Sequence, residues 1–164
     1  MINDFYKVAC MTFLMLIIGV SVGFGQVYTM EAEDADLTNA GVNASGGGCA
    51  NKSGSGLVFM RGTTAGDGDR VLAFNSIDAP STGKYTMKLT YFASKESKLE
   101  LVVNGGTKTV LSDFELTGFC YEGPSNVYSF EIDLNEGANN TITMSPVEGV
   151  TSPYLDKLEI FSTD

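Results

Sequence analysis

The sequence contains no histidine and no tryptophan, and its basic residues are half as numerous as its acidic ones. Lysine and arginine total 10 against 20 aspartates and glutamates, so the formal net charge is −10. Such an acidic chain is a poor partner for nucleic acid or for an anionic membrane surface. The lack of histidine removes the side chain most often used for general acid–base catalysis. The composition therefore favours cations or neutral molecules as ligands.

Paired carboxylates are the remaining route to catalysis, since two acids at a suitable separation can hydrolyse a glycosidic bond. The candidate pairs are Asp67 with Asp69 and Glu115 with Glu122. Their sequence context is that of ordinary turn acids. We therefore do not expect an enzyme.

Long hydrophobic runs are also scarce, and the clearest lies near the amino terminus. It covers residues 8–22, follows a charged residue and precedes a small-x-small triplet that ends at Gly25. This order is typical of a secretory signal peptide, which predicts a signal over residues 1–25 and one domain over residues 26–164. The run is shorter than the roughly 20 residues of a membrane span. We expect a protein that is secreted or displayed at the cell surface, with no membrane span in the mature chain; an uncleaved anchor is the alternative.

Cysteine is rare, and Cys10 lies within the predicted signal peptide, which leaves Cys49 and Cys120. An even number of cysteines in an oxidising compartment favours a disulfide. Closing a loop of this length would stabilise the fold by roughly 3–5 kcal/mol on the chain-entropy account. The alternative is two unpaired buried thiols.

Period-2 alternation, instead of helical periodicity, recurs along the rest of the chain. In the clearest run, Tyr85, Met87, Leu89 and Tyr91 alternate with lysines and threonines, which predicts a strand with one buried and one solvated face. Turn residues such as Asn104 and its following glycine separate the runs. The pattern predicts an all-β protein, an antiparallel β-sandwich of the jelly-roll type with about nine short strands. The predicted strands are an opening strand near Tyr28 and the segments 57–61, 70–77, 84–92, 98–104, 108–114, 127–134, 141–144 and 155–161.

Residues 39–56 are rich in glycine, serine, asparagine and alanine and form a longer segment than a simple connection requires. Both ordered functional loops and loose linkers have this composition. We expect an ordered loop, because the segment lies inside the domain and contains Cys49.

Several segments of the sequence follow one another in an order that is typical of a known family of protein modules. Residues 28–35 are similar to an opening Tyr-Glu-Ala-Glu-Asp-Ala, and the Gly/Ser-rich loop then leads into a short strand that ends at Phe59. Residues 79–91 match a central Ala-Pro-x-x-Gly-x-Tyr phrase, and residues 154–160 match the closing strand. Over nearly the whole mature domain the sequence thus resembles the carbohydrate-binding modules of families 6 and 35, which are galactose-binding-like β-sandwiches.

The resemblance implies a structural calcium ion between the two ends of the domain, held by Glu31, Glu33 and Asp156. Glu31 and Glu33 are two residues apart, so on a strand they would point to one face. Calcium takes six to eight oxygen ligands, and backbone carbonyls would complete the set. The alternative is that these acids are solvated charges at a strand edge.

The resemblance also implies a sugar site among the loops at one edge of the sandwich. The tryptophan that is usual in this site is absent, and Phe119 or Tyr121 would have to replace it. Tyr154 occupies the position of an asparagine that is usual in the family. Phe59 is a further aromatic candidate, and Asn126 is a candidate partner for a sugar hydroxyl. Aromatic faces and a few polar groups are what sugar recognition requires.

We therefore expect a secreted, non-catalytic carbohydrate-binding module for extracellular or cell-wall polysaccharide. The resemblance implies a separate glycan-degrading enzyme or a surface complex as its partner. The alternative is a structural or adhesive surface protein that keeps the jelly roll without binding sugar.

Overall fold

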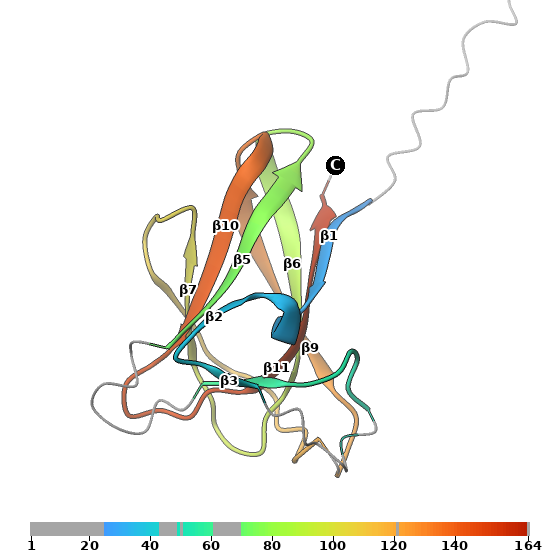
Figure 1. Ribbon diagram of the computed structural model, residues 1–164, viewed down its shortest axis with the longest axis vertical. Coiled ribbons are helices and arrows are strands. Elements are labelled where there is room, and N and C mark those ends of the chain that lie inside the picture. The colour runs from blue at the N-terminus through green and yellow to red at the C-terminus, as the bar shows by residue number, and fades with distance from the viewer. Residues whose placement is uncertain (1–24, 43–48, 50, 61–69, 121, 164) are drawn as a thin grey trace, which may run out of the picture.

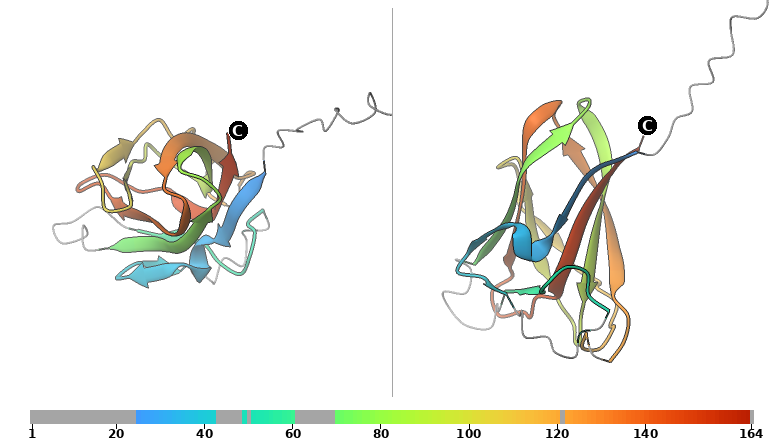
Figure 2. Two further views of the ribbon diagram at one scale, coloured as in Figure 1. Left: turned by 90° about the horizontal axis from the view of Figure 1, so that it is seen from above. Right: turned by 45° about the vertical axis from the view of Figure 1, so that its right-hand side comes forward.

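The computed structural model describes residues 25–42, 49, 51–60, 70–120 and 122–163. These residues form two antiparallel sheets packed face to face, so the predicted all-β sandwich is confirmed (Figures 1 and 2). The one helical element among them is a 3-10 turn at Ala32–Asp34. None of the described residues forms a helix that is long and apolar enough to cross a membrane. The predicted signal peptide lies outside the described residues and stays a prediction.

The first sheet has the strand order β3-β4-β11-β6-β9, and β1 also pairs with β11. Its strands are β1 (Gln26–Glu31), β3 (Gly41–Val42), β4 (Val58–Phe59), β6 (Gly83–Phe92), β9 (Asn126–Leu134) and β11 (Tyr154–Ser162). The second sheet has the order β2-β5-β10-β7-β8. Its strands are β2 (Asp36–Thr38), β5 (Val71–Ala79), β7 (Leu99–Val103), β8 (Thr109–Leu111) and β10 (Gly137–Pro146).

The described part contains eleven strands, where alternation predicts about nine. The additional strands, β2 and β3, have three and two residues, and β3 falls within the segment predicted as a loop. Runs of this length show no periodicity, so only their pairing with β5 and β4 defines them. The segment 39–56 is therefore partly strand, and residues 43–48 and 50 lie outside the described residues.

β6 shows why this sequence forms a sandwich. Tyr85, Met87, Leu89 and Tyr91 are all buried between the sheets, as the alternation predicts. A larger set from both sheets completes the main core, including Phe74, Ile142 and Leu158. Burial of apolar surface at about 25 cal/mol per Å² is the principal stabilising term for such a core.

β11 connects the elements that bear candidate site residues. β6 pairs with it along its whole length, while β4 pairs with Tyr154 and Leu155 and β1 pairs with its carboxyl-terminal half. The backbone N–H of Ser162 donates to the carbonyl of Gly25 at 3.0 Å, so the two ends of the described domain lie side by side (Figure 1). The opposite end of the sandwich carries the loops that precede β4 and β9 (Figure 2).

Candidate functional site

Three of the predicted aromatic residues, Phe59, Phe119 and Tyr154, line one cavity of about 310 Å³ at the loop end of the sandwich. We call it the loop-end cavity. They come from β4, from the loop before β9 and from the start of β11, so only the fold brings them together. The remaining lining residues are Met60, Ser94, Lys95, Thr151 and Ser152.

Strand register positions Phe59. It pairs with Tyr154 across β4 and β11, and the two ring centroids are 6.1 Å apart with a tilt of 45° between the planes. On its other side it pairs with Gly41 of β3. A Cβ atom at Gly41 would lie 2.7 Å from the Phe59 ring. The ring can therefore occupy its present place only because residue 41 is a glycine.

Tyr154 has two environments. It lines the cavity, and it also packs against a small buried cluster formed by Cys49, Leu57 and Phe92. That cluster is separate from the main core and includes the disulfide that joins Cys49 to Cys120, whose Cα atoms are 4.8 Å apart. The packed cluster fixes the tyrosine and leaves part of its surface facing the cavity.

Phe119 is 40% exposed in a loop that hydrogen bonds hold in place. The backbone N–H of Thr117 donates to the Ala93 carbonyl at 2.9 Å. The backbone N–H of Ala93 donates in return to the Thr117 hydroxyl, also at 2.9 Å. The Glu122 carboxylate accepts a hydrogen bond from the Phe119 N–H at 2.8 Å. Exposed aromatic rings on ordered loops often contact ligands.

The acids of this loop have structural contacts. Glu122 closes the turn at Phe119, and Glu115 accepts a hydrogen bond from the side chain of Asn126 at 2.8 Å. The other acidic pair considered from the sequence, Asp67 and Asp69, lies outside the described residues.

Two predicted sugar contacts do not join the loop-end cavity. Asn126 begins β9, where its amide nitrogen donates to Glu115 and its amide oxygen accepts from the Val127 N–H at 2.8 Å. It is not among the described residues that line the cavity. Tyr121 lies outside the described residues.

The three acids predicted to bind calcium gather around one segment, residues 53–56. The Ser53 N–H lies 3.1 Å from both carboxylate oxygens of Asp156. The Ser53 hydroxyl lies 2.6 Å from Glu31 Oε2 and 3.0 Å from Asp156 Oδ2. A hydroxyl carries one hydrogen, so at any moment it can donate to only one of these two oxygens.

Glu33 does not sit on a strand beside Glu31, and that part of the prediction is wrong. β1 ends at Glu31, and Glu33 lies in the 3-10 turn that follows. There Glu33 Oε1 accepts hydrogen bonds from the N–H groups of Ser55 and Gly56. Gly54 lies against both glutamates with φ +56°, and a Cβ atom there would clash with Glu33 Oε1.

Burial and neighbouring charges act on the acids of this cluster. Asp156 is 1% exposed, and burial raises its pKa; the Ser53 hydrogen bonds lower it, while the charges of Glu31 and Glu33 raise it further. Burial also raises the pKa of Glu33, but hydrogen bonds from its own backbone, Gly56 and Ser55 outweigh it, so the pKa of Glu33 is lowered. The fold thus holds a buried acid close to two others.

The chemistry of this donor set fits a hard cation. All three side chains offer carboxylate oxygens, and Glu33 Oε2 is buried with no hydrogen-bond partner among the described residues. As the side chains lie, however, no group of three or more His, Cys, Asp or Glu side chains in the described part forms a metal cluster. The N–H groups and hydroxyls of residues 53–56 instead supply most of the hydrogen bonds to these carboxylates.

Several residues of both sites escape prediction from the sequence. Lys95 and Ser94 line the loop-end cavity from the turn after β6, and Ser53 contacts two of the acids. The one available signal for Ser94 and Lys95 is their place directly after the strongest predicted strand. For Ser53 it is membership of the Gly/Ser-rich segment, which does not single out one serine.

No protein-family model matches this sequence, and no curated protein matches it. Solved structures do match. A family 35 carbohydrate-binding module from Clostridium thermocellum aligns with a TM-score of 0.70 and 24% identity, over 83% of this chain and 99% of that module. A family 35 module from Paenibacillus barcinonensis aligns with a TM-score of 0.66 and 24% identity over the same shares.

A third match is an exo-β-1,3-galactanase from Phanerochaete chrysosporium, with a TM-score of 0.66 and 19% identity. It covers 83% of this chain but 29% of the enzyme, so the likeness is confined to one part of that protein. At these identities the comparisons establish the architecture. This chain has the β-sandwich fold of family 35 carbohydrate-binding modules.

Proposed function

We propose that this chain is a non-catalytic carbohydrate-binding module that binds extracellular or cell-wall polysaccharide at the loop-end cavity. The observation that carries the proposal is the convergence of Phe59, Phe119 and Tyr154 on that cavity. The three aromatic side chains come from distant segments, and one of them is substantially exposed on an ordered loop. The fold shared with family 35 modules supports the same function.

Binding would depend on stacking and a small number of polar contacts. Aromatic faces pack against the C–H face of a sugar ring, and the Tyr154 hydroxyl, Ser94 and Lys95 are available for its hydroxyl groups. A volume of about 310 Å³ lies near the lower end of small-molecule sites, which range over roughly 300–1,000 Å³. This size favours the end or a short segment of a glycan.

The lining of the cavity supports binding without hydrolysis. Glycoside hydrolysis commonly uses two carboxyl groups that flank the bond. The described residues of the loop-end cavity include Lys95 but no aspartate or glutamate. Glu115 and Glu122, in the adjacent loop, accept hydrogen bonds from Asn126 and Phe119.

A structural calcium ion is the second part of the proposal, with Glu31, Glu33 and Asp156 as its ligands. The ion would neutralise three adjacent carboxylates and link β1 to β11. The unpartnered Glu33 Oε2 and the buried Asp156 support it. Because residues 53–56 lead directly into β4, an ion at this place would also steady Phe59.

Secretion and an enzyme partner complete the proposal. The predicted signal peptide and the disulfide both suit an oxidising compartment. The galactanase and a β-1,4-mannanase from Podospora anserina each contain a part with this fold within a longer chain. These matches support a separate glycan-degrading enzyme or a surface complex as the partner of this chain.

A glycan panel tests the proposal. The purified protein is screened against plant, fungal and bacterial polysaccharides, together with Phe119→Ala and with Leu116→Ala as a matched control. Leu116 lies in the same loop and is 66% exposed, but it does not line the cavity. We expect Phe119→Ala to lose binding and Leu116→Ala to keep it, with both melting as the parent does. Failure of the parent to bind any glycan would favour a structural or adhesive surface protein.

A further inference from the structure

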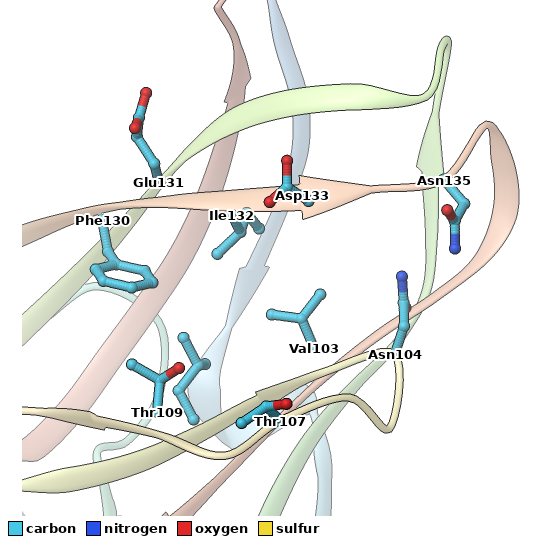
Figure 3. A pocket seen from close by; sticks show the side chains of 10 residues that line it. Val103, Asn104, Thr107, Thr109, Phe130, Glu131, Ile132, Asp133 and Asn135 are labelled. Atoms are coloured by element: carbon cyan, nitrogen blue, oxygen red, sulfur yellow. The ribbon is translucent and has the colours of Figure 1, made fainter.

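A second cavity, of about 380 Å³, opens on the flank of the sandwich (Figure 3). We call it the flank cavity. It lies between β9 of the first sheet and the β7–β8 hairpin of the second. It has no lining residue in common with the loop-end cavity.

The flank is open because two sheet edges meet there. Among the described strands, β9 pairs with β6 alone and β8 pairs with β7 alone. Both are therefore edge strands, and the sandwich is not closed by hydrogen bonding between them. The gap between these edges leaves room for a small ligand.

The floor of the flank cavity is apolar. Leu101 and Ile132 are buried, and Val103 and Phe130 are half-buried beside them. In Figure 3 the Phe130 ring and the Ile132 side chain extend from β9 toward Val103 and Thr109. One partly accessible aromatic ring thus lies next to aliphatic side chains.

The rim of the flank cavity is polar and carries amides and hydroxyls. Thr107 and Thr109 lie on the hairpin side, and Asn104 and Asn135 extend toward each other at one end (Figure 3). The Asn135 side chain has no hydrogen bond to another described residue, although its backbone N–H and carbonyl both contact Asn140. That amide is available to a ligand.

A buried asparagine holds this end of the rim rigid. Asn140 is 1% exposed, and its amide oxygen accepts from the Asn104 side chain and from the Asn135 N–H, each at 2.8 Å. Its amide nitrogen carries two hydrogens and shares them among the carbonyls of Asn135, Gly137 and Ile77, at 2.7, 2.9 and 3.2 Å. The Asn104 amide oxygen also accepts from the Thr141 N–H at 2.8 Å. Polar groups fixed in this way are preorganised for binding.

Charge is directed away from the flank cavity. Glu131 and Asp133 are among the residues of β9 that line it, but their carboxylates point to the other face of the strand (Figure 3). On that face Asp133 forms an ion pair with Lys84 at 3.7 Å. The interior therefore presents apolar, amide and hydroxyl groups, and this set favours an uncharged ligand over an ion.

We propose that the flank cavity binds a single ring of a neutral sugar. The apolar floor with Phe130 complements the C–H face of such a ring, and the amides and hydroxyls of the rim complement its hydroxyl groups. An acyl chain would leave the Asn135 amide and the hydroxyls of Thr107 and Thr109 without partners. The site does not depend on the loop-end cavity, and a chain with both would bind a polysaccharide bivalently.

The test is a titration of the isotope-labelled protein by NMR with methyl glycosides of glucose, galactose, mannose and xylose. We expect at least one glycoside to shift the side-chain amide signals of Asn104 and Asn135 and the backbone signals of Thr107 and Thr109. Asn135→Ala removes only the unpartnered amide, and Thr109→Val removes a hydroxyl at constant shape. Each should weaken binding by about tenfold, the order expected for one lost hydrogen bond.

Ser129→Ala is the matched control. Ser129 is exposed on β9 and is not among the residues that line the flank cavity, so the affinity of this variant should equal that of the parent. The same titration in Phe119→Ala separates the two sites: the flank signals should still shift, whatever becomes of the loop-end cavity. The proposal is overturned if no glycoside moves the flank signals. It is also overturned if Asn135→Ala and Thr109→Val bind as tightly as Ser129→Ala.

Discussion

The disulfide between Cys49 and Cys120 joins the segment that covers the acidic cluster to the loop that presents Phe119. A hydrogen bond from the Asn51 side chain to the Gly123 carbonyl, at 3.0 Å, links the same two segments. The loop-end cavity and the cluster of Glu31, Glu33 and Asp156 therefore share their supporting chain. A substitution in the acidic cluster should therefore alter glycan binding at the loop-end cavity, and a ligand in the cavity should alter the stability of the cluster.

Removal of the disulfide should weaken both stability and binding. We expect the double substitution Cys49→Ser and Cys120→Ser to lower the free energy of unfolding, measured in urea, by about 3–5 kcal/mol. Glycan affinity should fall as well, because Phe119 is the neighbour of Cys120 and loses its covalent support. An unchanged affinity in the folded double variant would show that the hydrogen bonds of the loop suffice to hold the ring.

Gly41→Ala should reduce glycan binding through Phe59. The new methyl group would lie 2.7 Å from the ring, so the ring must turn away from its present place beside Tyr154. Because a side chain yields and the backbone stays, we expect the free energy of unfolding to fall by no more than about 1–2 kcal/mol. Calorimetric titration with a bound glycan measures the affinity.

Gly83→Ala is the control for that substitution. Gly83 lies in β6, and a Cβ atom there would meet no other atom within 4 Å. Its affinity and melting temperature should stay at the parent values. If Gly41→Ala and Gly83→Ala lose the same amount of glycan affinity, the loss cannot be attributed to the contact with Phe59.

A chelator should lower the melting temperature if calcium binds the acidic cluster. An ion present at 100 times its dissociation constant stabilises the folded state by about 2.7 kcal/mol, and removing it removes that contribution. Scanning calorimetry with calcium and with EDTA measures the difference. Identical midpoints in the two conditions would contradict the calcium proposal.

Glu33→Gln separates the ion from the hydrogen bonds of the loop. The amide oxygen of glutamine can still accept from the N–H groups of Ser55 and Gly56, while the charge and the unpartnered oxygen are lost. We expect the calcium-dependent shift in melting temperature to shrink strongly in this variant. A full shift in Glu33→Gln would remove Glu33 from the set of ligands.

Asn140→Ala should be among the most destabilising polar substitutions in the described part of the chain. It removes both acceptor contacts of the amide oxygen and leaves the carbonyls of Ile77, Asn135 and Gly137 without this donor. We expect a loss of about 2–4 kcal/mol in the free energy of unfolding. Asn139→Ala is the comparison, since Asn139 is exposed on the same strand and should change stability by less than about 0.5 kcal/mol.

Two of the long strands were predictable from the sequence, because alternation over eight to ten residues is visible without any partner. β6 and β9 fall close to their predicted ranges for this reason. The equally long β10 was predicted only over residues 141–144, since its first half carries polar residues such as the buried Asn140. β3 and β4 have two residues each, and only their pairing with each other and with β11 makes them strands. Glu33 was misplaced because a three-residue 3-10 turn carries no periodic signal.

The candidate site was predictable to the extent that aromatic side chains stand out in polar loops. Phe59, Phe119 and Tyr154 do meet at one cavity. Asn126 was a candidate because it lies near Tyr121 in the sequence, yet its side-chain amide donates to Glu115 and does not line the cavity. The Asn140 network and the flank cavity depend on contacts between residues as far as 63 positions apart, so no local pattern reveals them.

The place of Gly25 and Ser162, near the two ends of the described domain, determines how this domain can be presented to a surface. Tyr154 begins β11 and Ser162 ends it, and a strand of that length spans about 26 Å. Gly25 lies beside Ser162, so a tag, a linker or an immobilising bead attached at either end is kept at the far pole. In such an assembly the loop-end aromatic residues face away from the support. Attachment at either end leaves them equally accessible.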